Sequence, residues 1–156
     1  MVENTIMHAT GLRHDGAVEV YVLDDRGIEE IRRAAELWGA NYLARPDRGW
    51  MKKSGNLRYG YERSSGQIVL VLDADFAVRS DFLEQTLPYF DDDALGILQT
   101  PQFFRTSEDN WVERGAAAQQ EQFYRIGLRA RDRHDGAICV GTNALYRRSS
   151  STPRTS

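Results

Sequence analysis

Lysine and cysteine are scarce in this chain. Lys52 and Lys53 are its only lysines, the other eighteen basic residues are arginines, and Cys139 is the single cysteine. One cysteine excludes an internal disulfide and suggests that the chain does not belong to an oxidising compartment. Any function that needs a lysine must therefore use one of two adjacent residues.

Long apolar runs and patches of one charge are missing as well. No run approaches the roughly 18 apolar residues that cross a membrane, and no signal-peptide pattern opens the chain, so we expect the chain itself to be soluble. The net charge is only −3, and the basic residues form no stripe. Nucleic acid is therefore not expected as a partner.

The residues that are present suffice for one buried core. The chain has 156 residues, of which 41% are hydrophobic and 10% aromatic, and this predicts a single domain over residues 1–148. The last residues, 149–156, read SSSTPRTS. They show no periodicity, and we expect a disordered tail there.

Strand-like and helix-like segments alternate along the chain. The expected strands are 18–25, 41–45, 67–72, 95–99 and 137–148. The expected helices are the segment between Gly27 and Gly39, residues 54–64, a helix capped by Ser80, and residues 107–131. Such alternation predicts an α/β fold, with a mostly parallel sheet covered by helices on both faces. Segment 67–72 is apolar on both faces, as a central strand should be.

Carboxylates follow two of these strands. Asp24 and Asp25 end the first strand, and Asp73 and Asp75 follow the central one. Because ligands of such sheets bind at the carboxyl ends of the strands, we expect all four side chains on one rim. Like charges repel unless a cation or hydrogen-bond donors oppose them. A ligand therefore explains the acids more economically than a solvated turn does.

Two ligand classes fit that rim. A receiver domain also places an acidic pair and a further aspartate around Mg²⁺, and Thr100 suits the hydroxyl that such domains use. It needs a lysine after its last strand, however, and both lysines here precede residue 54. The receiver interpretation fails on that point. The second class is nucleotide-sugar transfer.

Five motifs carry a resemblance to a known family. VYVLDD, KSGNLRYG, VLVLDADF, LGILQTPQFF and CVGTNALYRR occur in this order. Together they resemble the family 2 glycosyltransferases, in particular the bacterial cellulose synthase-like branch, from about residue 2 to residue 149. The resemblance implies a GT-A, Rossmann-like fold that begins here in the helix after the family's first strand.

The resemblance also implies roles for individual residues. Asp24 and Asp25 would contact the uracil and ribose of a UDP-sugar, although such a pair can also begin a turn. Asp73 and Asp75 would hold Mg²⁺ or Mn²⁺ against the diphosphate. The remaining substrate-binding positions would be Lys53 and Asn56 near the nucleotide, Gln99 at the floor of the site, and Gly141 and Thr142 beside the acceptor sugar. A solvated loop charge is the alternative for Lys53, and a purely structural strand end is the alternative for Gln99.

The resemblance further implies inverting, metal-dependent transfer from a UDP-sugar, such as UDP-glucose, to a growing polysaccharide. We expect a domain truncated at both ends, because the family's PTYNE-like strand, its TED motif with the general base, and its QxxRW motif are not found. We expect the parent enzyme to be embedded in the plasma membrane with this domain on the cytoplasmic face, and the chain alone to be inactive. The alternative is a non-catalytic nucleotide-sugar-binding or structural fragment. Arg26 and Arg58 depart from the family pattern, and their roles stay open.

Overall fold

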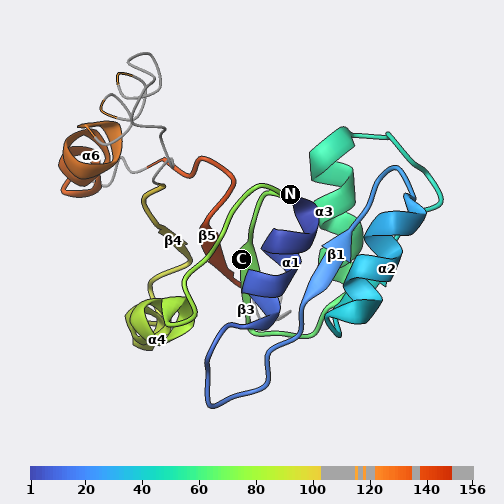
Figure 1. Ribbon diagram of the computed structural model, residues 1–156. Coiled ribbons are helices and arrows are strands. Elements are labelled where there is room, and N and C mark those ends of the chain that lie inside the picture. The colour runs from blue at the N-terminus through green and yellow to red at the C-terminus, as the bar shows by residue number, and fades with distance from the viewer. Residues whose placement is uncertain (103–114, 116–117, 119–121, 135–137, 149–156) are drawn as a thin grey trace, which may run out of the picture. The chain divides into compact units, whose positions relative to one another are not determined.

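The computed structural model describes residues 1–102, 115, 118, 122–134 and 138–148, along which helices and strands alternate (Figure 1). In chain order the elements are α1 (Val2–Thr10), β1 (Tyr21–Leu23), α2 (Glu29–Leu37), β2 (Asn41–Leu43), α3 (Lys52–Arg63), β3 (Ile68–Val71), α4 (Phe82–Thr86), the 3-10 helix η1 (Leu87–Asp91), β4 (Ile97–Gln99), the π-helix η2 (Phe123–Leu128), α6 (Arg129–Asp132) and β5 (Ala144–Arg147). Within the described ranges, no helix has the length and apolar character needed to cross a membrane.

The residues form two compact units. The first unit contains Met1–Val69, Asp73–Gly96, Arg147 and Arg148, and the second contains Leu70–Leu72 and the described residues between Ile97 and Tyr146. The expectation of one domain over residues 1–148 stays a prediction. The expected tail, 149–156, lies outside the described residues, and so does most of the helix expected at 107–131.

A parallel pair of strands organises the first unit. Tyr21, Val22 and Leu23 of β1 pair with residues 41–43 of β2. Side chains alternate between the two faces of a strand, and Val22 faces a buried cluster formed by Ile6 of α1, Ala35 of α2 and Ala40. The helices α1 and α2 thus pack on one face of this pair.

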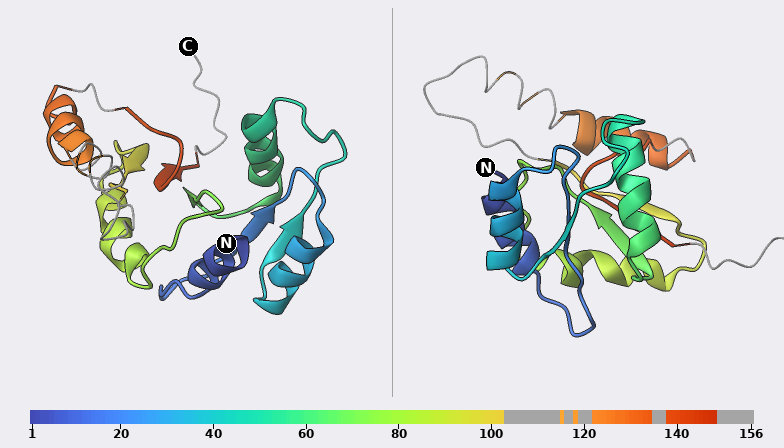
Figure 2. Two further views of the ribbon diagram at one scale, coloured as in Figure 1. Left: turned by 45° about the horizontal axis from the view of Figure 1, so that its top comes forward. Right: turned by 90° about the vertical axis from the view of Figure 1, so that its right-hand side faces the viewer.

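The opposite face of β1 packs against α3. A Cβ atom at Gly60 of α3 would lie 2.6 Å from a methyl carbon of Leu23. Only a residue without a side chain lets the helix come this close to the strand. The pair β1–β2 is therefore covered by helices on both faces, and Figure 2 shows α2 and α3 on either side of it. This part of the fold agrees with the prediction of a parallel sheet between helices.

The other sheet departs from that prediction. The strands pair in the order β3-β5-β4, and β4 runs antiparallel to β5, with Ile97 opposite Tyr146. We expected 67–72 to be the central strand, but β5 lies between its two neighbours, and its Ala144 and Leu145 are fully buried. The described strands thus form a mixed α/β structure with a small parallel sheet and an antiparallel pair.

Two local predictions need correction. Ser80 does not cap the next helix: Asp81 is the N-cap residue of α4, and the Ser80 carbonyl instead accepts a hydrogen bond from the Arg13 amide at 2.8 Å. The strand expected at 18–25 is shorter than predicted. Val18 lies outside β1 and is 42% exposed, because the core cluster extends only as far as Val20 along this segment.

Candidate functional site

Asp24 follows β1 and closes the turn into α2. Its Oδ1 accepts a hydrogen bond from the Arg26 amide at 2.8 Å, and its Oδ2 accepts from the Ile28 amide at 2.5 Å and from the Tyr42 hydroxyl at 2.8 Å. Burial by itself would raise the pKa of Asp24, but the bonds from Ile28 and Tyr42 outweigh it and lower the pKa. Asp24 is only 6% exposed, so its carboxylate is committed to the fold.

Asp25 points instead to the loop that precedes α3. Its carboxylate is paired with the guanidinium of Arg45 and accepts a hydrogen bond from the Gly49 amide at 3.2 Å. The hydrogen bond from Arg45 is the main reason why the pKa of Asp25 is lowered. The Asp25 side chain is 29% exposed, so part of this carboxylate still faces solvent.

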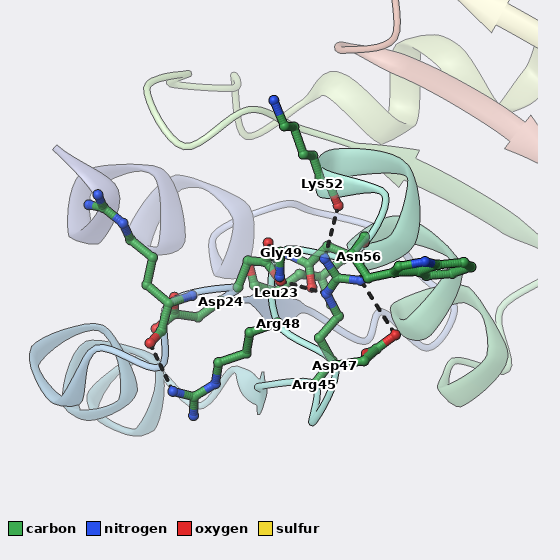
Figure 3. Close-up of polar contacts among 11 residues, drawn as sticks. Leu23, Asp24, Arg45, Asp47, Arg48, Gly49, Lys52 and Asn56 are labelled. Atoms are coloured by element: carbon green, nitrogen blue, oxygen red, sulfur yellow. Dashed lines mark hydrogen bonds and ion pairs between the residues drawn. The ribbon is translucent and has the colours of Figure 1, made fainter.

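Arg45 joins Asp25 to the loop 46–52. Its side chain is only 1% exposed, and it donates to the backbone carbonyls of Trp50 and Lys52, the latter at 3.3 Å. Figure 3 shows Arg45 with Asp47, Gly49 and Lys52 gathered around it. A buried guanidinium keeps its charge and needs partners for its five N–H donors. The loop is therefore folded around this one cation, which fixes the start of α3.

The first turns of α3 connect the ends of two strands. Asn56 donates from Nδ2 to the carbonyl of Leu23 at 3.0 Å, at the end of β1. Lys53, three residues earlier, places Nζ 2.6 Å from Oδ1 of Asp73, just beyond β3. Residues three apart share a helix face, so one face of α3 contacts both acidic segments. Lys53 and Asn56 thus lie beside Asp73 and the end of β1, although β1 and β3 belong to two separate sheets rather than to one.

The Asp73-Ala74-Asp75 segment forms a tight turn. The Phe76 amide donates to the Asp73 carbonyl at 3.2 Å, and the hydroxyl of Thr5 in α1 donates to the Ala74 carbonyl at 2.9 Å. Thr5 is 8% exposed and thus supports the turn from the core. The side chain of Asp75 is exposed to solvent.

The two carboxylates of this turn fit a hard divalent cation. Mg²⁺ is commonly held by one or two carboxylates, with substrate phosphates and water completing its shell. The Lys53 ammonium already lies against Asp73, which shows that this carboxylate accepts a cation. No cluster of three or more acidic, histidine or cysteine side chains that could hold a metal occurs in the described part of the chain. Water or phosphate oxygens would complete the shell of a cation held by these two carboxylates.

Gln99, Gly141 and Thr142 lie together in the second unit. The amide Nε2 of Gln99 donates to the Thr142 carbonyl at 3.0 Å, and its Oε1 accepts from the Val140 amide at 3.0 Å. Gly141 has a φ of 81°, and Asn143 has a φ of 49°, so the segment turns sharply on either side of the buried Thr142. Gln99 thus helps to hold the loop 139–143 in place, together with Thr100, whose hydroxyl donates to the Asn143 carbonyl at 2.7 Å.

Sequence reasoning missed three residues that shape the site. Arg45, Tyr42 and Thr5 each contact an acidic segment that is distant in the sequence. For Arg45 a signal existed, because an arginine directly after an apolar strand of an α/β fold falls at the same rim as the acids. Thr5 and Tyr42 carried no such signal, since their partners depend on helix packing and strand register.

Two comparisons place these features among known proteins. The family model for glycosyl transferase family 2 matches residues 2–152. The cellulose synthase 1 catalytic subunit [UDP-forming] of Komagataeibacter xylinus is 32% identical over 156 residues, covering 95% of this chain and 20% of that protein. The corresponding subunit of Komagataeibacter sucrofermentans is 29% identical over 157 residues, again covering 95% of this chain and 20% of that protein.

A further relative carries a different name. The beta-monoglucosyldiacylglycerol synthase of Nostoc sp. is 27% identical over 110 residues, or 67% of this chain and 24% of that protein. The chain thus spans about a fifth of the length of the cellulose synthase subunits that it matches. The match over residues 2–152 and the similarity to these subunits show that the chain belongs to glycosyl transferase family 2.

Proposed function

We propose that this chain is the donor-binding part of a glycosyltransferase that takes a sugar from a UDP-sugar. The observation that carries the proposal is the bridge made by α3. Asn56 of α3 donates a hydrogen bond to the end of β1, and Lys53 of α3 donates one to Asp73. A nucleoside diphosphate needs hydrogen-bond acceptors for its base and sugar hydroxyls at one end and cations for its phosphates at the other.

Asp25 would receive the nucleoside end of the donor. Its carboxylate is partly exposed and fixed in direction by Arg45, which favours a rigid acceptor for base N–H or ribose hydroxyl groups. Asp24, which we expected to share this role, is buried and already accepts three hydrogen bonds. Asp24 would therefore act through the turn that positions Asp25.

Asp73 and Asp75 would hold Mg²⁺ or Mn²⁺ at the diphosphate end. The bound cation would neutralise negative charge that develops on the leaving UDP. Lys53 would add a second positive charge for the phosphates, and Asn56 would keep α3 in register with β1. We further propose an inverting reaction, in which the general base comes from outside the residues assigned here.

The remaining details of the function rest on the relatives. The name of the Komagataeibacter xylinus subunit ends in "UDP-forming", which supports UDP-glucose as the donor and a growing glucan as the acceptor here. On this proposal Gln99, Gly141 and Thr142 border the acceptor sugar, with Gln99 shaping the loop. We also propose that the whole enzyme is embedded in the plasma membrane, with this domain on its cytoplasmic face.

A non-catalytic role is the alternative, because Asp24, Asp25 and Asp73 all have partners within the chain. The experiment is a calorimetric titration of the chain with UDP, GDP and ADP in Mn²⁺, followed by a transfer assay on a longer protein that contains it. We expect UDP to bind at least about tenfold more tightly than GDP, and UDP release from UDP-glucose to require a glucan acceptor. Equal binding of the three nucleotides would refute the donor assignment. UDP binding without transfer would favour the non-catalytic role.

A further inference from the structure

Lys53 and Asp73 form an ion pair at the place where the cation is expected. The Lys53 Nζ lies 2.6 Å from Asp73 Oδ1, and the two side chains are 52% and 38% exposed. Lys53 stands in the first turn of α3, and Asp73 follows β3. The ammonium is therefore bonded to one of the carboxylate oxygens that a divalent cation would need as a ligand.

A lysine and a divalent cation cannot share this oxygen without cost. The two positive charges would approach each other closely around one carboxylate, and like charges at that distance repel. Without a nucleotide, Lys53 therefore opposes metal binding. With a diphosphate in place, the ammonium gains phosphate oxygens as a second partner, and the carboxylate is then available to the metal.

We propose that Lys53 competes with the metal for Asp73 when no nucleotide is bound, and that a bound diphosphate attracts the Lys53 ammonium to its phosphate oxygens instead. Metal and nucleotide then bind cooperatively. The inference rests on the proposed function, because it takes Asp73 and Asp75 as the metal-holding pair. It adds a coupling between two ligands. Such coupling is reciprocal: if UDP tightens Mn²⁺ binding by some factor, Mn²⁺ tightens UDP binding by the same factor.

The chain offers a matched control for this proposal. Lys52 is the other lysine, adjacent in sequence, and its contact with Arg45 uses the backbone carbonyl, which a side-chain substitution keeps. Lys52→Met and Lys53→Met remove the same charge from the same turn. Both side chains are exposed, so both variants should fold.

The experiment titrates the nucleotide-free chain with Mn²⁺ by calorimetry and repeats the titration with saturating UDP. Without UDP, we expect Lys53→Met to bind Mn²⁺ about twofold to fivefold more tightly than the unsubstituted chain, the range that an exposed ion pair accounts for. At saturating Mn²⁺, UDP should bind Lys53→Met at least about threefold more weakly. The factor by which UDP tightens Mn²⁺ binding should then fall at least about twofold, because Mn²⁺ affinity rises without UDP but not with it, and Lys52→Met should leave this factor nearly unchanged.

The outcomes separate this inference from the function on which it rests. Unchanged or weaker Mn²⁺ affinity in Lys53→Met would overturn the competition and leave the metal assignment standing. An equal gain in Lys52→Met would also overturn it, because the effect would then reflect net charge alone. If the unsubstituted chain and Asp75→Asn bind Mn²⁺ equally, the metal assignment fails and the inference fails with it.

Discussion

Arg45 and Asp25, twenty residues apart, form a pair in which the cation is buried and the anion is partly exposed. The Arg45 side chain is 1% exposed and that of Asp25 is 29% exposed. The guanidinium also holds the Trp50 and Lys52 carbonyls, so its charge supports both the acidic pair and the start of α3. A residue of the candidate site is thus also a structural residue.

Asp25→Ala should therefore destabilise the fold. It leaves a buried guanidinium with only the more distant Asp47 carboxylate, at 3.8 Å, and breaking a buried pair from one side is strongly unfavourable. We expect Tm to fall by about 5 °C or more in thermal unfolding. The control is Arg58→Ala, which breaks the exposed pair with Glu62 and should change Tm by less than about 2 °C. Equal shifts in the two variants would refute the structural role of Asp25.

Gly55→Ala should also act through Arg45. A Cβ atom at this position in α3 would collide with the Arg45 guanidinium and with the Trp50 carbonyl, two groups that are bonded to each other. Alanine normally stabilises a helix relative to glycine, but here overpacking should cost about 1–3 kcal/mol in urea unfolding. Gly127→Ala is the matched control, since its Cβ atom would meet Phe123 at an ordinary 3.8 Å. A stabilised Gly55→Ala variant would contradict this packing.

Acid should weaken the fold through Asp24. Its pKa is lowered in the folded chain, because hydrogen bonds from Ile28 and Tyr42 outweigh the effect of burial. Such a carboxyl contributes stability above its unfolded pKa of about 3.9 and loses that contribution as the pH falls through the lower folded value. We expect urea midpoints to be steady from about pH 7 to 5 and to drop below about pH 4. Asp24→Asn should make this drop shallower, and Tyr42→Phe should give an intermediate slope.

Other acids share this dependence. The pKa values of Asp25 and Asp81 are lowered too, chiefly by hydrogen bonds from Arg45 and Arg79. Asp24→Asn should therefore reduce the acid sensitivity without abolishing it. An Asp24→Asn variant whose midpoint falls as steeply as that of the unsubstituted chain would show that the turn into α2 does not depend on this carboxylate.

The sequence predicts the order of elements and the position of the acids well, because both follow from local patterns. Apolar runs identified β1, β2, β3 and β4 to within a few residues, and the acids indeed follow β1 and β3. Strand direction is not encoded in such runs, so the antiparallel pairing of β4 with β5 could not be predicted. The structural use of Asp24 was foreseen only as an alternative, since its main partners are backbone amides.

Partners from distant segments were the least predictable. Arg147 and Arg148, at the end of the CVGTNALYRR motif, show this clearly. Arg147 donates to the carbonyls of Phe90 and Leu95, and Arg148 donates to those of Tyr61 and Gly66. Two adjacent arginines thus contact the segment after α4, the last turn of α3, and Gly66 beyond it. Sequence similarity identifies the motif, but only the three-dimensional arrangement shows which contacts its two arginines make.

Gln99 should control the loop 139–143. Gln99→Met keeps the side-chain length but removes the acceptor of the Val140 amide and the donor to the Thr142 carbonyl. We expect hydrogen exchange at the Val140 amide to accelerate about tenfold, because a local hydrogen bond protects it. The Leu145 amide, in the strand β5, serves as the internal reference and should keep its rate. Equal acceleration at both amides would indicate general unfolding instead.

The most direct test of the proposed donor site is the metal dependence of UDP binding. Calorimetry would measure the affinity for UDP with Mn²⁺ and with a chelator, in the unsubstituted chain, in Asp75→Asn and in the exposed control Asp15→Asn. We predict that Mn²⁺ tightens UDP binding about tenfold or more, that Asp75→Asn loses this gain, and that Asp15→Asn keeps it. Equal UDP affinity with and without metal would contradict the assignment of Asp73 and Asp75.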